Sequence, residues 1–166
     1  MFYQNPKVLV ACGVAWQEKL LFCRRAQDPA LGACSPPSGF LEQGETLQAG
    51  AARETFEEAG IILDPAKLDL YSVINLPAIN QIWISFRCDL TEDPMVRPGP
   101  ESLDAGFFTE QELLGMEIAW QSVAPDWIGV FFQQRRTKRF AIHLVDIAWC
   151  PGVDSRVRDY PLLPQA

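Results

Sequence analysis

The hydrophobic positions along the chain form several short apolar runs and one longer segment with helical spacing. Apolar runs bounded by polar residues or by Pro and Gly are typical of β-strands. Strands are expected in this way at Val8–Trp16, Lys19–Arg25, Lys67–Leu76, Gln81–Leu90, Asp104–Phe108 and Phe140–Trp149. Three prolines and two glycines between Pro29 and Gly39 predict a loop.

Helical spacing is clearest after Thr46, where apolar or small residues recur every one, three or four positions before Gly60. Thr46 is suited to cap the start of this helix, and Gly60 is suited to end it. A capping-box pattern at Thr109–Glu112 predicts a short second helix. A third helix is expected over Val123–Arg136, because Pro125 is tolerated in a first turn.

The order of these elements, β-β-α-β-β-β-α-α-β, indicates the fold class. It predicts an α+β or α/β protein in which a mixed β-sheet is sandwiched between helices, an α/β/α sandwich. A chain of 166 residues that is 48% hydrophobic and 21% charged is large and apolar enough to fold as one domain. We expect this domain over residues 1–150 and a Pro-rich C-terminal tail, read as a loop, at 151–166.

Net charge, hydropathy and cysteine usage restrict the partners and the compartment. The net charge of −7 argues against non-specific nucleic-acid binding. Apolar stretches fall short of the roughly 18 residues that span a membrane, and the N-terminus lacks the pattern of a signal peptide. Five scattered cysteines with no CxxC pair predict reduced thiols in a cytoplasmic protein, without a zinc site or a disulfide framework.

Three glutamates gather on one face of the first predicted helix. Glu54 and Glu58 are one turn apart, and Glu57 lies beside them. Like charges at this spacing destabilise a helix by a few tenths of a kcal/mol, so their presence indicates a use. Carboxylate oxygens are the ligands that hard divalent cations such as Mg²⁺ or Mn²⁺ prefer.

The residues around these glutamates fit a longer pattern. Gly39 is followed by five residues and Glu45, and seven further residues lead to the run from Arg53 to Ile61. This spacing resembles the Nudix box, G-x5-E-x7-R-E-U-x-E-E-x-G-U, where U is a bulky apolar residue. Thr55 at the first U position is the one departure, and its methyl group can pack inward. The resemblance implies the Nudix fold and hydrolysis of a pyrophosphate bond.

The resemblance also implies the metal ligands. In the family, the first and last glutamates of this run, here Glu54 and Glu58, hold the divalent cation. The middle one, here Glu57, assists catalysis or binds another ion. A backbone carbonyl at the start of the box, here from Gly39 or Ser38, often joins them. Cations are needed because the charge of a pyrophosphate repels a nucleophile.

Two further roles follow from the resemblance. Arg53 is expected to pair with Glu45, which fixes the loop against the helix. Nudix enzymes also use a carboxylate outside the box as a metal ligand or general base, and Glu101 occupies the matching place after Pro98–Pro100. The alternative for Glu101 is an exposed loop carboxylate with no catalytic role.

Other candidates rest on position alone. Arg24 and Arg25 end a predicted strand just before the active-site loop, where they either bind the substrate or only solubilise the surface. Gln81 begins a strand that faces the box in this family's layout, which makes it a substrate-binding candidate. His143 is expected to be packed rather than catalytic. The tryptophans are expected mostly in the core, although one is suited to stack on an adenine ring.

The flanking sequence narrows the resemblance to one branch of the family. Tyr3–Lys7, Leu21–Arg25, Pro37–Glu42 and Pro100–Leu103 look like Nudix hydrolases that act on FAD and ADP-ribose. This branch often carries an N-terminal zinc ribbon, from which the chain departs because it has no CxxC pair. The expected reaction splits a nucleoside diphosphate derivative into a nucleoside monophosphate and a phosphorylated product. The alternatives are a nucleoside triphosphate house-cleaning pyrophosphatase and a nucleotide-binding sensor or scaffold, and a homodimer stays open.

Overall fold

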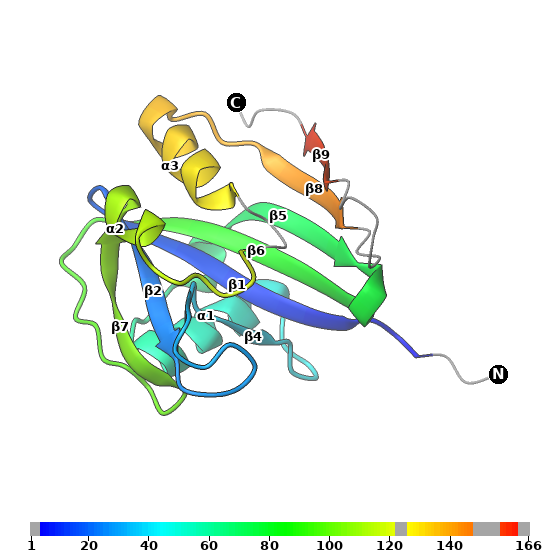
Figure 1. Cartoon of the computed structure of the whole chain (residues 1–166), viewed down its shortest axis with the longest axis horizontal. Helices are drawn as coiled ribbons and strands as arrows, with labels where there is room; N and C mark the ends of the chain where they lie inside the picture. The colour runs from blue at the N-terminus through cyan, green and yellow to red at the C-terminus, as the bar shows by residue number, and fades with distance from the viewer. Residues whose placement is uncertain (1–3, 122–125, 148–156, 163–166) are drawn as a thin grey trace.

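The structure is a computed structural model that describes residues 4–121, 126–147 and 157–162, the last as backbone only. Strands within these ranges belong to one sheet (Figure 1). They are β1 Lys7–Trp16, β2 Lys19–Arg25, β3 Cys34–Ser35, β4 Ser38–Phe40, β5 Asp69–Leu76, β6 Gln81–Leu90, β7 Ser102–Thr109, β8 Ile142–Ile147 and β9 Val157–Leu162.

The three predicted helices are present as α1 Leu47–Ala59, α2 Glu110–Leu114 and α3 Trp127–Thr137. The side chain of Thr46 accepts a hydrogen bond from the Ala49 N–H at 3.2 Å, and Gly60 ends α1 in the left-handed conformation with φ of 71°. α2 has the predicted capping box. α3 begins at Trp127, and the start predicted at Val123 lies outside the described residues. Short 3₁₀ helices, η1 Pro65–Lys67 and η2 Pro77–Ile79, precede β5 and β6.

The sheet is mixed, in agreement with the prediction. Its main order is β3-β2-β1-β6-β5-β8-β9, with β4 paired to β1 and β7 paired to β2. β1 runs parallel to β6, β5 runs parallel to β8, and the other pairs are antiparallel. The central position of β1 places one face of this strand towards α1 and the other towards α3 (Figure 1).

Alternation along β1 builds a core on each side of the sheet. Val10, Cys12 and Val14 pack with the small residues of α1 in one buried cluster. Ala15 joins the second cluster, which contains the buried face of α3. Gly13 has Phe131 of α3 directly above it, and a side chain at Gly13 would lie 3.0 Å from that ring. The sheet is therefore sandwiched between helices, as the element order predicted.

Two segments predicted as loops contain strands, so those predictions are wrong in part. The Pro- and Gly-rich segment 29–39 carries β3, which pairs with β2 through Cys23 and Ser35, and most of β4. In the tail, β9 pairs with β8, and Pro161 lies opposite His143. Proline lacks an N–H but is tolerated in a strand whose other edge is unpaired, so proline content alone misled the prediction. The domain boundary at residue 150 stays a prediction.

The described part of the chain has free cysteines and no candidate membrane helix. Cys12, Cys23 and Cys34 are buried, Cys88 is partly buried, and all four are free thiols. Cys150 lies outside the described residues. Among the helices of the described ranges, none is long and apolar enough to cross a membrane.

Candidate active site

The three glutamates of α1 differ in their exposure. Glu54 and Glu58 are each 8% exposed, whereas the side chain of Glu57 is 52% exposed. Thr55 between them is fully buried, and its hydroxyl donates to the Ala51 carbonyl at 2.8 Å. This explains how Thr is accommodated at an apolar position of the box: its one polar group is satisfied within the helix.

Arg53 connects the helix to the preceding loop. Its Nε and Nη2 donate to both carboxylate oxygens of Glu45, at 3.2 and 2.8 Å. Nη1 donates to Glu54 at 2.7 Å and to Glu57 at 3.1 Å, and Nη2 also reaches the Phe40 carbonyl at 3.1 Å. The guanidinium of Arg53 lowers the pKa of Glu45. A bidentate arginine pair of this kind fixes orientation as well as charge.

Strand β4 brings backbone groups against the buried carboxylates. The Ser38 N–H donates to Glu58 Oε1 at 3.3 Å. Gly39 lies so close to Glu54 that a Cβ at this position would overlap the Glu54 carboxylate. Any larger residue at position 39 would therefore force the Glu54 carboxylate or the strand to move. The φ of Gly39 is not in the left-handed region, so the close approach to Glu54, and not the backbone conformation, favours glycine here.

Burial gives the two inner glutamates raised pKa values. The pKa of Glu58 is raised to about 7, mainly because the carboxyl group is removed from water. The charges of Glu54 and Glu101 add to this rise, and the Ser38 N–H and the charge of Arg25 oppose it. Burial also raises the pKa of Glu54, while Arg53 lowers it. A bound cation would relieve this accumulation of negative charge, so the donor set fits a hard divalent ion.

The carboxylates do not converge on one point as the side chains stand. In the part of the chain that the structure describes, no group of three or more His, Cys, Asp or Glu is close enough together to hold an ion. Arg53 Nη1 donates to both Glu54 and Glu57 in this arrangement, so these two carboxylates share one hydrogen-bond donor.

Glu101 is brought to the same end of α1 by the loop before it. Arg97 N–H donates to the Ala59 carbonyl at 2.8 Å, and Gly99 N–H donates to the Glu58 carbonyl at 3.1 Å. The Glu101 carbonyl accepts from the Ala26 N–H at 2.9 Å. The exposed Glu101 carboxylate is near enough for its charge to contribute to the raised pKa of Glu58.

The remaining predicted residues divide into those near the site and those away from it. Arg25 lies near: its charge lowers the pKa of Glu58, and its guanidinium stands 6.0 Å from the Trp120 ring centroid. Arg24 lines a small hollow elsewhere, with Cys34 and Asp104. Gln81 does not line the main pocket but accepts a hydrogen bond at 2.8 Å from Trp83, which does.

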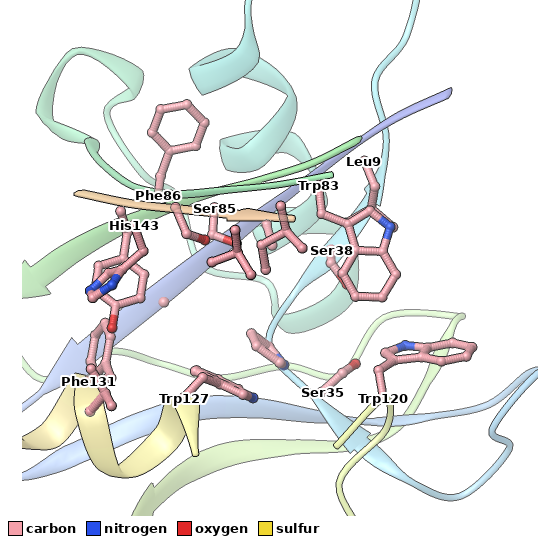
Figure 2. A pocket seen from close by; sticks show the side chains of 18 of the residues that line it. Leu9, Ser35, Ser38, Trp83, Ser85, Phe86, Trp120, Trp127, Phe131 and His143 are labelled. Carbon is pink, nitrogen blue, oxygen red and sulfur yellow. The ribbon is translucent and has the colours of Figure 1, made fainter. Parts of the chain in front are cut away.

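A pocket of about 350 Å³ opens beside the box on the α3 side of the sheet (Figure 2). Its walls come from β1, β5, β6, β8, α3 and the segments at 35–38 and 119–120. Aromatic side chains dominate it, among them Trp83, Trp120, Trp127 and Phe131. Ser38 belongs both to this pocket and to the contact with Glu58, so the pocket and the carboxylates are adjacent.

Comparison with known proteins decides the family. The model of the NUDIX domain matches residues 6–140. This chain belongs to the Nudix family. It is a Nudix hydrolase with the Nudix fold, as the box implied.

Relatives of this Nudix hydrolase include proteins with named activities and solved structures. An ADP-ribose pyrophosphatase of Methanocaldococcus jannaschii is 28% identical over 130 residues, which cover 76% of this chain and 75% of the relative. A NUDIX hydrolase from Nitrosomonas europaea is 40% identical, with a TM-score of 0.74 over 88% of this chain and 81% of that one. The NUDIX domain of Shewanella oneidensis NrtR, solved with ADP ribose, shares the fold at 14% identity, with a TM-score of 0.65 over 82% and 90% of the two chains.

Sequence reasoning about this Nudix hydrolase missed the pocket and one residue in it. Ser35 lies in a segment that was predicted to be a loop, and the tryptophans were assigned mainly to the core. Their positions in the chain share no motif, because the pocket is assembled from strands and helices far apart in sequence. The only hint of this pocket in the sequence was the number of aromatic residues, which is larger than a hydrophobic core requires.

Proposed function

We propose that this Nudix hydrolase cleaves the pyrophosphate bond of a nucleoside diphosphate derivative such as ADP-ribose or FAD. The products are a nucleoside monophosphate and a phosphorylated remainder, AMP and ribose 5-phosphate in the case of ADP-ribose. The observation that carries the proposal is the pair of buried carboxylates, Glu54 and Glu58, held against Ser38 and Gly39 beside a large pocket.

The reaction is proposed to depend on Mg²⁺ or Mn²⁺. Glu54, Glu57 and Glu58 would hold the ion, together with the Gly39 carbonyl and Glu101. When bound, a divalent cation neutralises phosphate oxygens and lowers the pKa of a coordinated water. The buried negative charge described above supports this choice, because burying carboxylates without a cation is unfavourable.

The residues of the chain supply the proton acceptor and the positioning. Water attacks one phosphorus, the bond from that phosphorus to the bridging oxygen breaks, and the bridging oxygen leaves with the other phosphate. The proton from the water goes to a carboxylate, for which Glu54, Glu57, Glu58 and Glu101 are the candidates.

Two arginines have supporting roles in the proposal. Arg53 keeps the loop, the helix and the carboxylates in register through its contacts with Glu45, Glu54 and Phe40. Arg25, which lies near Trp120 of the pocket and acts on Glu58 through its charge, is suited to bind a phosphate of the substrate. Arg24 and Gln81 stay candidates for contacts with outer parts of the substrate.

The named relatives support ADP-ribose as the first substrate to test. The Methanocaldococcus relative is an ADP-ribose pyrophosphatase and matches three quarters of both chains. We also propose that residues 1–150 form the single Nudix hydrolase domain and that 151–166 are a C-terminal tail. The protein is also proposed to be cytoplasmic and to form a homodimer. We propose no nucleic-acid partner and no membrane partner. The free thiols in the described part of the chain support the location.

A hydrolysis panel tests the proposal directly. ADP-ribose, FAD, NADH, dinucleoside polyphosphates and oxidised nucleoside triphosphates are incubated with and without Mg²⁺, and the products are identified by mass. Nucleoside monophosphate from ADP-ribose or FAD supports the proposal. Faster turnover of triphosphates favours the house-cleaning alternative, and tight ADP-ribose binding without any product favours the sensor.

A further inference from the structure

Glu58 lies in the last turn of α1, where a helix opens most easily. α1 ends at Ala59, so Glu58 is one residue from the end of the helix, whereas Glu54 is in its interior. The last carbonyls of a helix have no partner within it, and helix ends fray before the middle does. Glu58 is nevertheless only 8% exposed. Its position is therefore fixed by contacts from outside the helix.

The main-chain carbonyl of Glu58 accepts hydrogen bonds from two other segments. Gly99 N–H, in the 97–101 loop, donates to it at 3.1 Å. The Cys23 thiol of β2 also donates to it, with Sγ 3.8 Å from the oxygen. A carbonyl oxygen has two lone pairs, so both are used. Since the Ser38 N–H of β4 donates to the Glu58 carboxylate, the residue is held at its backbone and at its side chain.

Cys23 makes this contact from the interior of the sheet. Its backbone pairs with Ser35 of β3 on one edge of β2 and with Ala105 of β7 on the other. The residue is 1% exposed and belongs to the same core cluster as Ala59. A thiol carries its proton at neutral pH, so Cys23 is a donor there. The sheet thus presents a fixed donor to the end of α1, as a supporting group needs.

The contact with Glu58 distinguishes Cys23 from the other thiol in this core cluster. Cys12 of β1 is also fully buried and packs in the same cluster beneath α1. Among the hydrogen bonds of the described residues, however, none joins Cys12 to α1, whereas one joins Cys23 to Glu58. If the two thiols only filled space, their substitution would have equivalent effects. The hydrogen bond to a proposed metal ligand makes them different.

We infer that Cys23 is a positioning residue of the metal site: its thiol holds the end of α1 so that the Glu58 carboxylate stays in place for the cation. The inference rests on the proposed function, because that function makes Glu58 a metal ligand. Residues that orient a metal ligand from behind change metal affinity or activity when they are replaced. The effect of Cys23 is small for such a residue, because an S–H···O hydrogen bond is weak.

Metal binding without substrate tests the inference. Mn²⁺ is titrated into the full chain, free Mn²⁺ is measured by its EPR signal, and Glu58→Gln identifies the binding that belongs to this site. Cys23→Ala, which removes the donor, is expected to weaken that binding roughly fivefold. Cys23→Val removes the donor but keeps the core filled, so it should show the same loss, and it takes the place of Cys23→Ala if that variant does not fold. Cys23→Ser, which retains a donor, should bind Mn²⁺ more tightly than either.

Cys12→Ala is the matched control, because it removes an equally buried thiol from the same core cluster. It is expected to lose stability, as buried large-to-small substitutions do, and to bind Mn²⁺ as the wild type does. In a Glu58→Gln background, Cys23→Ala should have no further effect on Mn²⁺ binding, because the residue through which Cys23 acts has been changed.

The inference is overturned if the Cys23 variants bind Mn²⁺ like the wild type, or if Cys12→Ala weakens binding as much. An equal loss in Cys23→Ser and Cys23→Val would also overturn it, since packing and not the donor would then be responsible. Hydrolysis with unchanged Mn²⁺ affinity in the Cys23 variants would leave the proposed function standing without the inference. Cys23-dependent Mn²⁺ binding without hydrolysis would do the reverse, and a wild type that binds no Mn²⁺ would overturn both.

Discussion

At the residue scale, the active site of this Nudix hydrolase depends on carboxylates kept out of water. Glu54 and Glu58 are buried against a strand, whereas Glu57, on the same helix face, is half exposed. The cause is the approach of β4, where Gly39 leaves room for the Glu54 carboxylate. Burial therefore raises the pKa values of Glu54 and Glu58, whereas the Glu57 side chain stays in contact with solvent.

The buried Glu58 predicts a pH dependence of stability in the metal-free protein. Its pKa is raised from 4.5 in the unfolded chain to about 7 in the folded one. The folded state therefore retains a proton that the unfolded state has lost, so the free energy of unfolding falls as the pH rises from 4.5 to 7. The loss is at most roughly 3 kcal/mol. Urea unfolding in EDTA at a series of pH values measures it.

Glu58→Gln is the comparison for this measurement. In this variant the free energy of unfolding is expected to fall much less between pH 4.5 and 7 than in the wild type. A smaller fall due to Glu54 should remain. Addition of Mg²⁺ at pH 8 is expected to restore stability to the wild type more than to the variant. If the free energy of unfolding falls with pH as steeply in Glu58→Gln as in the wild type, other groups control the pH dependence.

Gly39→Ala tests the close approach at β4. The added methyl group would overlap the Glu54 carboxylate, so Glu54 or the strand has to move. We expect kcat/KM to fall by roughly 100-fold, because a displacement of about 1 Å at a catalytic group has an effect of this size. The assay is hydrolysis of the best substrate from the panel.

Gly115→Ala is the control for Gly39→Ala. A Cβ at Gly115 would meet only the Glu112 carbonyl at an ordinary 3.5 Å, and its φ of −92° suits alanine. It should leave kcat/KM near the wild-type value. Equal activity of the two variants would mean that Gly39 is not required for the geometry of the site.

At the element scale, the site is the junction of α1, β4 and the 97–101 loop. The loop donates two backbone hydrogen bonds to the last carbonyls of α1, which are otherwise unpaired at a helix end. Gly99 lies against the Glu57 carbonyl so closely that a Cβ would overlap it. Docking of this loop both completes the helix and brings Glu101 to the carboxylates.

Gly99→Ala is expected to disturb this junction. Because the loop has to shift away from α1, the variant should lose stability by about 2 kcal/mol, as overpacked sites do, and should lose activity through displacement of Glu101. Thermal unfolding and hydrolysis assays measure the two effects. Met95→Ala, two residues before this loop at a residue that is 69% exposed, is the control and should change neither. Wild-type stability in Gly99→Ala would argue against the docked loop.

At the scale of the whole molecule, local sequence patterns predicted α1 and its glutamates. The parts of the fold that were not predicted depend on contacts between residues far apart in the sequence. Thr46, Gly60 and the spacing from Gly39 to Ile61 lie within one stretch of sequence, so their arrangement follows from local rules. The strands β3 and β9 were missed because their pairing partners, β2 and β8, override a Pro-rich composition.

The pocket shows the same limit for function. Trp83 and Trp120 meet across 37 residues of sequence, and Ser35 joins them from a third segment. No spacing rule links these positions, since only the sheet order places them together. The box thus identifies the bond that is cleaved, whereas the residues that recognise the rest of the substrate require the structure.

The most direct test of the central claim is the rate of AMP formation from ADP-ribose, read by product mass, for the wild type, Glu57→Gln and Glu58→Gln. The account predicts Mg²⁺-dependent release of AMP and ribose 5-phosphate by the wild type. It also predicts a fall of roughly 100-fold or more in each variant, with the fold retained. Near wild-type rates in both variants would contradict it, because the carboxylates of α1 would then not carry the reaction.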